Sequence, residues 1–230
     1  MSETVALSIV HDIVARGLTT GDRLPLEAEM LTEYRVSRSS LREALRILEV
    51  QGLISLKPGP GGGPVVGRVD ARHLARTATL YFHLGGMTYG QLFETQQEFE
   101  PICAARACQH PDRRERLRPF MESYQAVPQG PDYHASTREF HDVVYDLAAN
   151  PVLALISKAV TQILTVHIIS TMDPVDMHAA IHEEHQVLAR TIVAGHANRA
   201  RELTEEHFRR QHEYYLRRAP SRIDDLIEWR

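Results

Sequence analysis

The chain has 230 residues, 43% of them hydrophobic and 24% charged, and this composition excludes a disordered tail, a collagen-like fibre and a low-complexity scaffold. The formal net charge of −4, taken alone, argues against a nucleic-acid-binding protein. Polar residues interrupt every apolar run, including Val152 to Ile156, so we expect no membrane helix. The N-terminus lacks the basic region of a signal peptide. We therefore expect a cytoplasmic protein that contacts no membrane.

The first 68 residues carry their charge unevenly. They hold eight basic and eight acidic residues, whereas the remainder holds 18 and 22, which accounts for the whole net charge. Between Arg35 and Lys57 there are five basic residues against two acidic ones. Because the local field matters more than total charge for binding phosphates, this segment is a candidate basic patch.

Apolar spacing predicts three helices at the start of the chain. The first runs from about Val5 to Val14, with Ser2 or Thr4 as its cap. The second fits 27–34, and the third follows the N-cap Ser37 and ends near residue 52. A strand over 53–57, a Gly/Pro tip and a return strand from residue 65 come next. Three helices and a hairpin predict a winged helix-turn-helix domain over residues 1–68.

The sequence pattern of residues 69–230 predicts a second, all-helical domain, so we expect a mainly α fold. Helical patterns separated by proline, glycine or asparagine breaks predict a bundle of about seven helices, over 70–85, 88–109, 112–126, 132–148, 151–170, 174–195 and 197–217. Cys103 and Cys108 lie five apart in one of these helices and therefore face different sides. We expect both as buried thiols rather than as a disulfide or zinc ligands.

The third helix carries the candidate DNA-contacting residues. Arg38, Arg42 and Arg46 are four apart and form one stripe, and Ser39 and Ser40 occupy the first turn. An arginine fork matches the O6 and N7 atoms of guanine, and hydroxyl groups at a helix start suit a phosphate. An arginine stripe alone also fits an ordinary solvated helix face. The preceding short helix and the hairpin tip favour DNA binding.

The run from Gly21 to Leu31, the run from Val36 to Ile54 and the Lys57-Pro-Gly-Pro-Gly-Gly-Gly tip resemble the N-terminal domain of GntR-family transcriptional regulators. The resemblance implies that Arg38 and Arg42 contact bases in double-stranded operator DNA. It also implies that the wing touches DNA and that serines lie near phosphates. The serines are Ser37, Ser39 and Ser40, and the wing residues are Lys57, Gly59 and Gly61. Arg46 is a further candidate because it lies on the same stripe as Arg38 and Arg42. Family members often have an arginine that contacts DNA where this chain has Ala28, so one contact is missing.

The helical segment resembles the FCD ligand-binding domain of the FadR subfamily. The match rests on Phe140-His141 followed by Ala149-Asn150-Pro151, on Glu184-His185 and on Glu206-His207. The resemblance implies a divalent metal, Zn²⁺, Ni²⁺ or Mn²⁺, held by His141, His185 and His207. Thr137 stands where the family has an aspartate ligand, so a water or an effector oxygen would fill the fourth place.

Two alternatives to this metal site remain open from the residues themselves. The three histidines also fit hydrogen-bonded core residues that hold no metal. His178, His182 and His185 share one helix face, which fits a local metal site or a partly solvated surface.

The effector pocket is predicted at Gln96 and Thr137. Gln96 stands where family members have an arginine that is thought to pair with an effector carboxylate, and glutamine offers no cationic fork. We therefore expect an effector that is larger or less polar than a small, strongly acidic metabolite.

These observations favour a ligand-responsive, sequence-specific DNA-binding regulator that is not an enzyme. We expect a homodimer that acts as a repressor and that a small-molecule effector releases from its operator. A metal-dependent hydrolase that uses the three histidines is the alternative, since three histidines and an open position also form a catalytic zinc arrangement. A purely architectural DNA binder is a third possibility, but it leaves the helical domain without a purpose.

Overall fold

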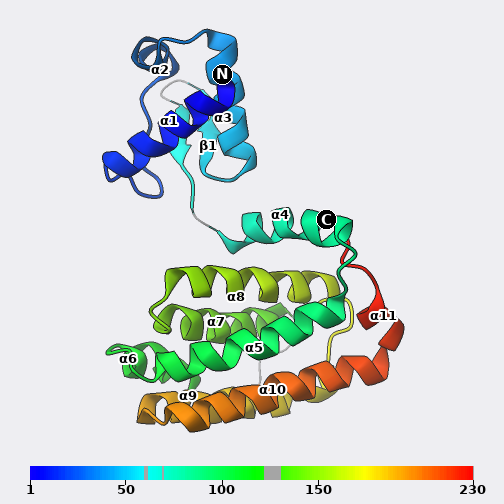
Figure 1. Cartoon of the computed structure of the whole chain (residues 1–230). Coiled ribbons are helices and arrows are strands. Elements are labelled where there is room, and N and C mark those ends of the chain that lie inside the picture. The colour runs from blue at the N-terminus through cyan, green and yellow to red at the C-terminus, as the bar shows by residue number, and fades with distance from the viewer. Residues whose placement is uncertain (60–61, 69, 122–130, 230) are drawn as a thin grey trace. The chain divides into compact units, whose positions relative to one another are not determined.

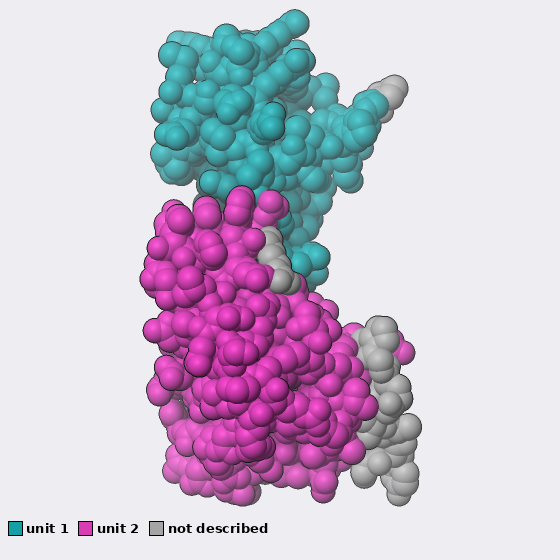
Figure 2. Space-filling model, turned by 90° about the vertical axis from the view of Figure 1, so that its right-hand side faces the viewer, with its two compact units in different colours: residues 1–73 teal, residues 74–230 magenta. Residues whose placement is uncertain are grey.

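Figure 1 shows the computed structural model of the chain, which describes residues 1–59, 62–68, 70–121 and 131–229. The chain divides into two compact units, residues 1–73 and residues 74–230, drawn in teal and magenta in Figure 2. The sequence placed this division between residues 68 and 69. In the structure the first unit extends to His73, because the ring of His73 packs directly against Gly52. A Cβ added at Gly52 would lie 2.3 Å from this ring.

The first unit has the predicted winged helix-turn-helix order. Its elements are α1 (Ser2–Ala15), α2 (Glu27–Tyr34), α3 (Arg38–Val50), β1 (Ile54–Lys57) and β2 (Gly63–Val66). The strands are antiparallel, with Ile54 opposite Val66 and Lys57 opposite Gly63. One apolar cluster joins the three helices to the hairpin, and its members include Ile9, Met30, Leu41, Leu48 and Ile54.

Two helix starts in this unit differ in how they are capped. Ser37 caps α3 as predicted, because its Oγ accepts the backbone N–H of Ser40 at 3.2 Å. The prediction that Ser2 or Thr4 caps α1 is wrong, since the helix begins at Ser2 itself and its N-cap makes no side-chain bond. The backbone N–H of Val5 already bonds the carbonyl of Met1 at 3.1 Å, which places residues 2–4 inside the helix.

The second unit is helical, as expected. The boundary between the units falls within its first helix, α4 (Ala71–Leu84). The other described helices are α5 (Tyr89–Ala107), α6 (Arg113–Leu117), α7 (Pro131–Leu147), α8 (Pro151–Leu164), α9 (His178–Ala194), α10 (Ala197–Arg218) and α11 (Pro220–Asp224). A π-helical turn, Thr165–Ile169, continues α8, and 3-10 turns lie at Arg118–Phe120 and Val175–Met177.

Three helix boundaries differ from the sequence expectation. In place of the helix expected over 112–126, the structure has the short helix α6 followed by a 3-10 turn. The turn contains Pro119, which lacks the N–H that an α-helix needs. Residues 122–126 lie outside the described part of the chain. The helix expected from residue 174 begins at His178. Pro220, expected as a break, instead starts α11, where its missing N–H costs nothing.

Helix α5 lies at the centre of the second unit (Figure 1). It packs most extensively against α10 and also contacts α7, α8 and α9. The core between these helices includes Ala104, Phe140, Tyr145, Leu188 and Ile192. Cys103 and Cys108 are buried free thiols, which confirms the expectation for both cysteines.

Helix α8 and its π-helical turn form a single apolar segment, Pro151–Ile169, of 19 residues. By length and composition alone it is apolar enough to cross a membrane, so the interruption of its apolar runs by polar residues was not sufficient ground for expecting no such helix. Half of the segment is buried inside the bundle, which is also how the core helix of a globular protein looks. Serine, threonine, glutamine and one charged residue, Lys158, interrupt its apolar runs, and these are too few to take the segment out of the membrane-spanning range of mean hydropathy.

Candidate functional site

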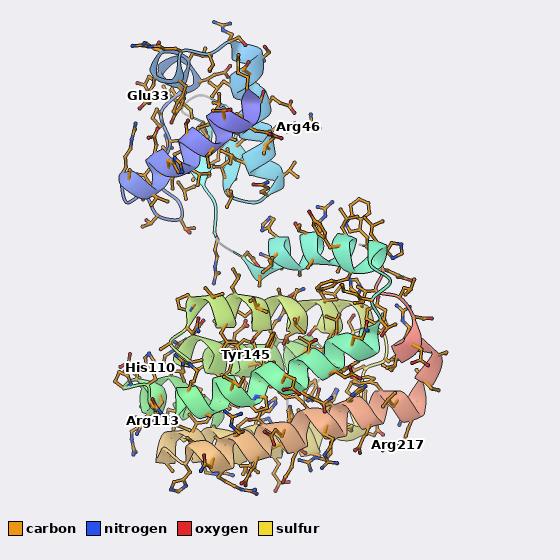
Figure 3. All side chains as sticks on the ribbon, in the orientation of Figure 1. Glu33, Arg46, His110, Arg113, Tyr145 and Arg217 are labelled. Carbon is orange, nitrogen blue, oxygen red and sulfur yellow. The ribbon has the colours of Figure 1, made fainter. Side chains whose placement is uncertain are left out.

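The arginine stripe, Arg38, Arg42 and Arg46, lies on the exposed face of α3, opposite the buried Leu41 and Leu48. Figure 3 shows Arg46 projecting from the ribbon of this helix. Among the described residues, no acidic side chain pairs with Arg38 or Arg46. These two guanidinium groups therefore present their donors to solvent.

Arg42 differs from its two neighbours because it forms an ion pair. Its Nε lies 3.0 Å from Oε1 of Glu27, the first residue of α2, although the Arg42 side chain stays 71% exposed. Glu27 precedes Ala28, the position at which the sequence lacks a DNA-contacting arginine. Next to the position that lacks the arginine, the acidic side chain of Glu27 thus forms an ion pair with Arg42, one of the arginines predicted to contact DNA.

Three hydroxyl groups gather at the start of α3. Ser37 Oγ lies 2.9 Å from Ser39 Oγ and 3.0 Å from Ser40 Oγ. Ser37 and Ser39 are exposed, and Ser40 is half-buried. Hydroxyl groups beside the free N–H groups of a helix start form a favourable environment for a phosphate.

The tip of the hairpin is built around glycine. Gly59 has φ +95°, and a Cβ at Gly62 would lie only 2.2 Å from the carbonyl oxygen of Lys57. The N–H of Gly62 bonds the carbonyl of Gly59 at 2.8 Å and closes the turn. Lys57 is exposed at the end of β1, whereas Gly61, which the sequence also singled out, lies outside the described residues. In the described part of the tip, the Lys57 side chain is therefore exposed, and the glycines leave the backbone without side chains to cover it.

The second unit brings the three predicted metal ligands together. His141 comes from α7, His185 from α9 and His207 from α10, and each offers a nitrogen that lies within 4.8 Å of the other two. The side chains are buried, with exposed fractions of 5%, 6% and 2%. We call these residues the histidine cluster.

Burial sets the protonation state of two members of this cluster, His141 and His185. It lowers the pKa of His141 and of His185 well below the usual value, and the neighbouring histidines lower both further. The neutral imidazole that results is the form that binds metals. His185 Nε2 is buried and has no hydrogen-bond partner in the described structure, so no other group competes with a cation for this nitrogen. Three such nitrogens fit Zn²⁺ or Ni²⁺.

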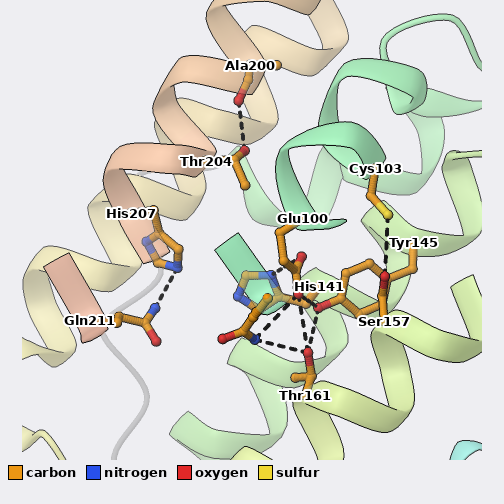
Figure 4. Close-up of polar contacts among 11 residues, drawn as sticks. Glu100, Cys103, His141, Tyr145, Ser157, Thr161, Ala200, Thr204, His207 and Gln211 are labelled. Carbon is orange, nitrogen blue, oxygen red and sulfur yellow. Dashed lines mark hydrogen bonds and ion pairs between the residues drawn. The ribbon is translucent and has the colours of Figure 1, made fainter. Parts of the chain in front are cut away.

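His207 has a partner on each ring nitrogen. Its Nδ1 lies 2.5 Å from Glu184 Oε2, and the other oxygen of Glu184 accepts from Arg210 at 2.8 Å. We therefore assign the ring proton to Nδ1, which donates to this carboxylate. Nε2 then carries the lone pair and accepts the side-chain amide of Gln211 at 2.6 Å, as Figure 4 shows.

Glu100 is a buried carboxyl group beside the cluster. Its Oε2 lies 3.9 Å from His141 Nδ1, and its Oε1 accepts from Tyr145, from Thr161 at 3.2 Å and from Gln96 at 3.5 Å (Figure 4). Burial raises the pKa of Glu100 to about 8, although these three hydrogen bonds act in the opposite direction. We call Glu100 and its three donors the Glu100 network.

The predicted effector residues, Gln96 and Thr137, line the same pocket. The pocket contains about 510 Å³ of empty space, part of it open to solvent, and His141 and Gln211 also line it. Its other walls combine the polar side chains of His134 and Arg138 with apolar or aromatic ones that include Ile169, Pro174, Ile181, Phe208 and Tyr215. Gln96 donates to Thr161 at 3.1 Å. The pocket therefore adjoins both the histidine cluster and the Glu100 network.

The second group of histidines on α9 does not converge. His178 Nε2 bonds Asp173 at 2.6 Å, and its ring stacks on Tyr133 with 3.4 Å between the ring centroids. His182 Nε2 lies 3.1 Å from the amide nitrogen of Gln186. Of this trio, His185 alone joins the group of possible metal ligands found among the described residues.

The sequence analysis missed three residues that contact the histidine cluster. Gln211 follows His207 by one helical turn, and Glu100 follows Gln96 by one turn, so helical spacing was a usable signal for both. Glu184 gave no such signal, because it serves His207 on another helix rather than its sequence neighbour His185.

Comparisons with known proteins bear on both units. Residues 1–62 match the family model described as bacterial regulatory proteins, gntR family, and residues 91–210 match that of the FCD domain. The Uxu operon regulator of Haemophilus influenzae is 25% identical over 203 residues, 84% of this chain and 74% of that protein. The transcriptional repressor NanR of Escherichia coli is 24% identical over 198 residues, 81% and 71% of the two chains. A solved structure, Streptococcus agalactiae GntR, shares the fold with a TM-score of 0.70 at 22% identity, covering 93% of this chain and 100% of that one.

Proposed function

Because the chain belongs to the GntR family of bacterial regulators and carries an FCD domain, we propose that this ligand-responsive DNA-binding regulator is a repressor that its effector releases from a short operator. We place it in the FadR subfamily and in the cytoplasm, where operator DNA lies. The family consists of transcription regulators, so the hydrolase alternative has no support. We assign residues 1–68 to DNA binding and residues 69–230 to the effector, the metal and dimer formation.

In this proposal the first turn of α3 reads DNA. Arg38 and Arg42 contact base edges in the major groove, with Arg46 further along the same stripe. Ser37, Ser39 and Ser40 lie near phosphates, and Lys57 and the glycines of the wing approach the backbone. The exposure of the stripe and the unpaired state of Arg38 support these roles.

We expect two copies of the chain to bind together. Two recognition helices spaced by one DNA turn require a near-palindromic site. Large apolar side chains remain exposed on α4 and α8 and offer surface for a second copy: Leu74, Tyr81, Leu84, Val152 and Ile156. The occupant we propose for this surface is a second copy, because a palindromic operator demands a symmetric pair. The same pairing, rather than a membrane, would cover the exposed side of α8.

His141, His185 and His207 would hold one divalent metal, Zn²⁺, Ni²⁺ or Mn²⁺. When bound, the ion supplies a Lewis-acidic anchor for a ligand oxygen. The burial of the three side chains, the lowered pKa of His141 and of His185, and the absence of a hydrogen-bond partner for His185 Nε2 among the described residues support this assignment. Glu184 holds the proton of His207 on Nδ1 and orients the ring.

The observation that carries the proposal is the pocket in which Gln96, Thr137 and His141 meet. The charge around residue 96 argues against a small, strongly acidic effector, because Gln96 is neutral and contacts the carboxyl group of Glu100 rather than a cation. Aromatic and aliphatic walls accept a larger, less polar body. Gln96 and Thr137 then supply neutral hydrogen bonds to its oxygens.

Two experiments on protein purified without a metal-affinity tag test this function. Selection from a random DNA pool should return a short near-palindrome, and a pool without one would contradict the proposal. A thermal-shift screen with Zn²⁺, Ni²⁺ or Mn²⁺ present would compare citrate, lactate, malate and gluconate with bulkier, less charged compounds. We expect the largest shift, and release of the selected DNA, from the second group. Release by a small hydroxy acid at micromolar concentration would refute the effector assignment.

A further inference from the structure

We propose that Gln211 couples the effector pocket to the histidine cluster, because its side chain binds the His207 nitrogen that a metal needs and at the same time lines the pocket. This inference rests on the proposed function, since it concerns the regulation of the same site. It makes Gln211 a positioning residue whose side chain has two alternative partners.

The first step follows from the proton on His207. Glu184 lies 2.5 Å from Nδ1, so that nitrogen carries the proton and Nε2 carries the one lone pair in the plane of the ring. Gln211 donates its amide N–H to this lone pair at 2.6 Å. One lone pair cannot accept a hydrogen bond and coordinate a cation at the same time. Gln211 must therefore leave His207 before His207 acts as a ligand.

The second step concerns the amide after it leaves. Gln211 is only 9% exposed, so an amide without a partner there costs free energy. Gln211 lines the pocket together with two other polar side chains, those of Gln96 and Thr161. An effector oxygen in this pocket gives the released amide a new partner. Effector and metal therefore favour each other's binding, and the coupling is reciprocal.

This coupling predicts an unusual sign for a substitution. Gln211→Leu keeps most of the side-chain volume but removes the donor that competes for His207 Nε2. Metal affinity should then increase, by roughly threefold to tenfold if one ordinary hydrogen bond no longer has to be broken. A residue that only supports the fold would have the opposite effect, because its loss would loosen the cluster and weaken metal binding.

The measurement is a Zn²⁺ titration against a competing chelator, with wild-type protein, Gln211→Leu and Gln211→Ala. Gln97→Leu is the matched control, because Gln97 also contacts a histidine, His212 Nδ1 at 2.9 Å, that is outside the cluster. We expect tighter Zn²⁺ binding in both Gln211 variants and no change in the control. Melting curves without metal identify a variant that fails to fold, and the remaining variant then decides the question.

A second readout follows the amide itself. In a ¹⁵N–¹H spectrum, the side-chain amide signal of Gln211, identified by its loss in Gln211→Leu, should shift with stoichiometric Zn²⁺, whereas the Gln97 signal should not. If wild-type protein binds no Zn²⁺, the proposed metal site itself fails. If wild-type protein binds Zn²⁺ but the Gln211 variants bind it equally well or more weakly, or the Gln211 signal stays unmoved, the coupling is refuted while the metal site stands.

Discussion

The arginine stripe of α3 lies along one helix, the histidine cluster of the second unit is assembled from three helices, and the surroundings of the two groups are opposite. The arginines project into solvent, and within the described part of the chain Arg42 alone has an acidic partner. The histidines are almost fully buried, and buried neighbours contact them. His207, for example, forms hydrogen bonds with Glu184 and with Gln211. Water compensates a lost contact at the surface, whereas in the bundle a lost partner leaves a buried group unsatisfied.

This difference teaches how each region responds to change. A substitution in the stripe should alter DNA binding and leave the free energy of unfolding almost unchanged. A substitution among the buried groups should alter stability, metal binding and ligand binding together, because the groups share partners. The following predictions test that contrast.

The largest expected effect concerns removal of one cluster ligand. With Zn²⁺ at 100 times its Kd, binding adds about 2.7 kcal/mol to the stability of the wild-type protein. For a chain of this size that is a rise in Tm of roughly 5–10 °C. His185→Ala should lose this rise entirely. Differential scanning fluorimetry with and without Zn²⁺ measures it, and His212→Ala, which removes a histidine outside the cluster, should keep it.

Tyr145→Phe tests the Glu100 network. It removes a hydrogen bond to the buried carboxyl group of Glu100 and should lower the free energy of unfolding by about 1–3 kcal/mol. Urea denaturation measures the change. Ser221→Ala, which removes a hydroxyl group from an exposed side chain, should have almost no effect. Equal stability of the two variants would mean that Tyr145 does not hold Glu100.

Arg38→Ala tests the exposed side of the comparison. Loss of a base-contacting arginine should weaken operator binding by about 1–3 kcal/mol and relax sequence preference. The free energy of unfolding should change by less than about 0.5 kcal/mol. Fluorescence anisotropy with the selected operator and urea denaturation give the two values. Arg199→Ala, an exposed arginine of the second unit, should change neither.

The smallest expected effect comes from Glu27→Gln. This variant releases Arg42 and removes a negative charge from the proposed DNA-facing surface, so DNA affinity should rise roughly twofold to fivefold at low salt. The gain should shrink as salt is added. Glu43→Gln makes the same charge change on α3 without breaking the Arg42 pair. An equal gain in both variants would assign the effect to charge alone.

The two regions also differ in how far the sequence could predict them. Periodicity and the N-cap Ser37 located α3, and a spacing of four placed its arginines on one face, because these relations are local. The three histidines come from separate helices, and their convergence was expected only through a family resemblance. The role of Gln211 depends on a proton that Glu184 fixes from another helix, so no local pattern reveals it. The predicted α1 cap failed because a helix start depends on backbone bonds that composition does not reveal.

The apolar segment Pro151–Ile169 has a consequence for the biosynthesis of the chain. A stretch of this length is a hazard while it is unprotected, because exposed apolar segments of incomplete chains aggregate. The helices that cover α8 are α5 and α7, and both precede it in the sequence. When α8 leaves the ribosome its partners have therefore already been made, and it can be buried without waiting for α9 or α10. The order of the helices along the chain thus shortens the time for which its most apolar segment is exposed.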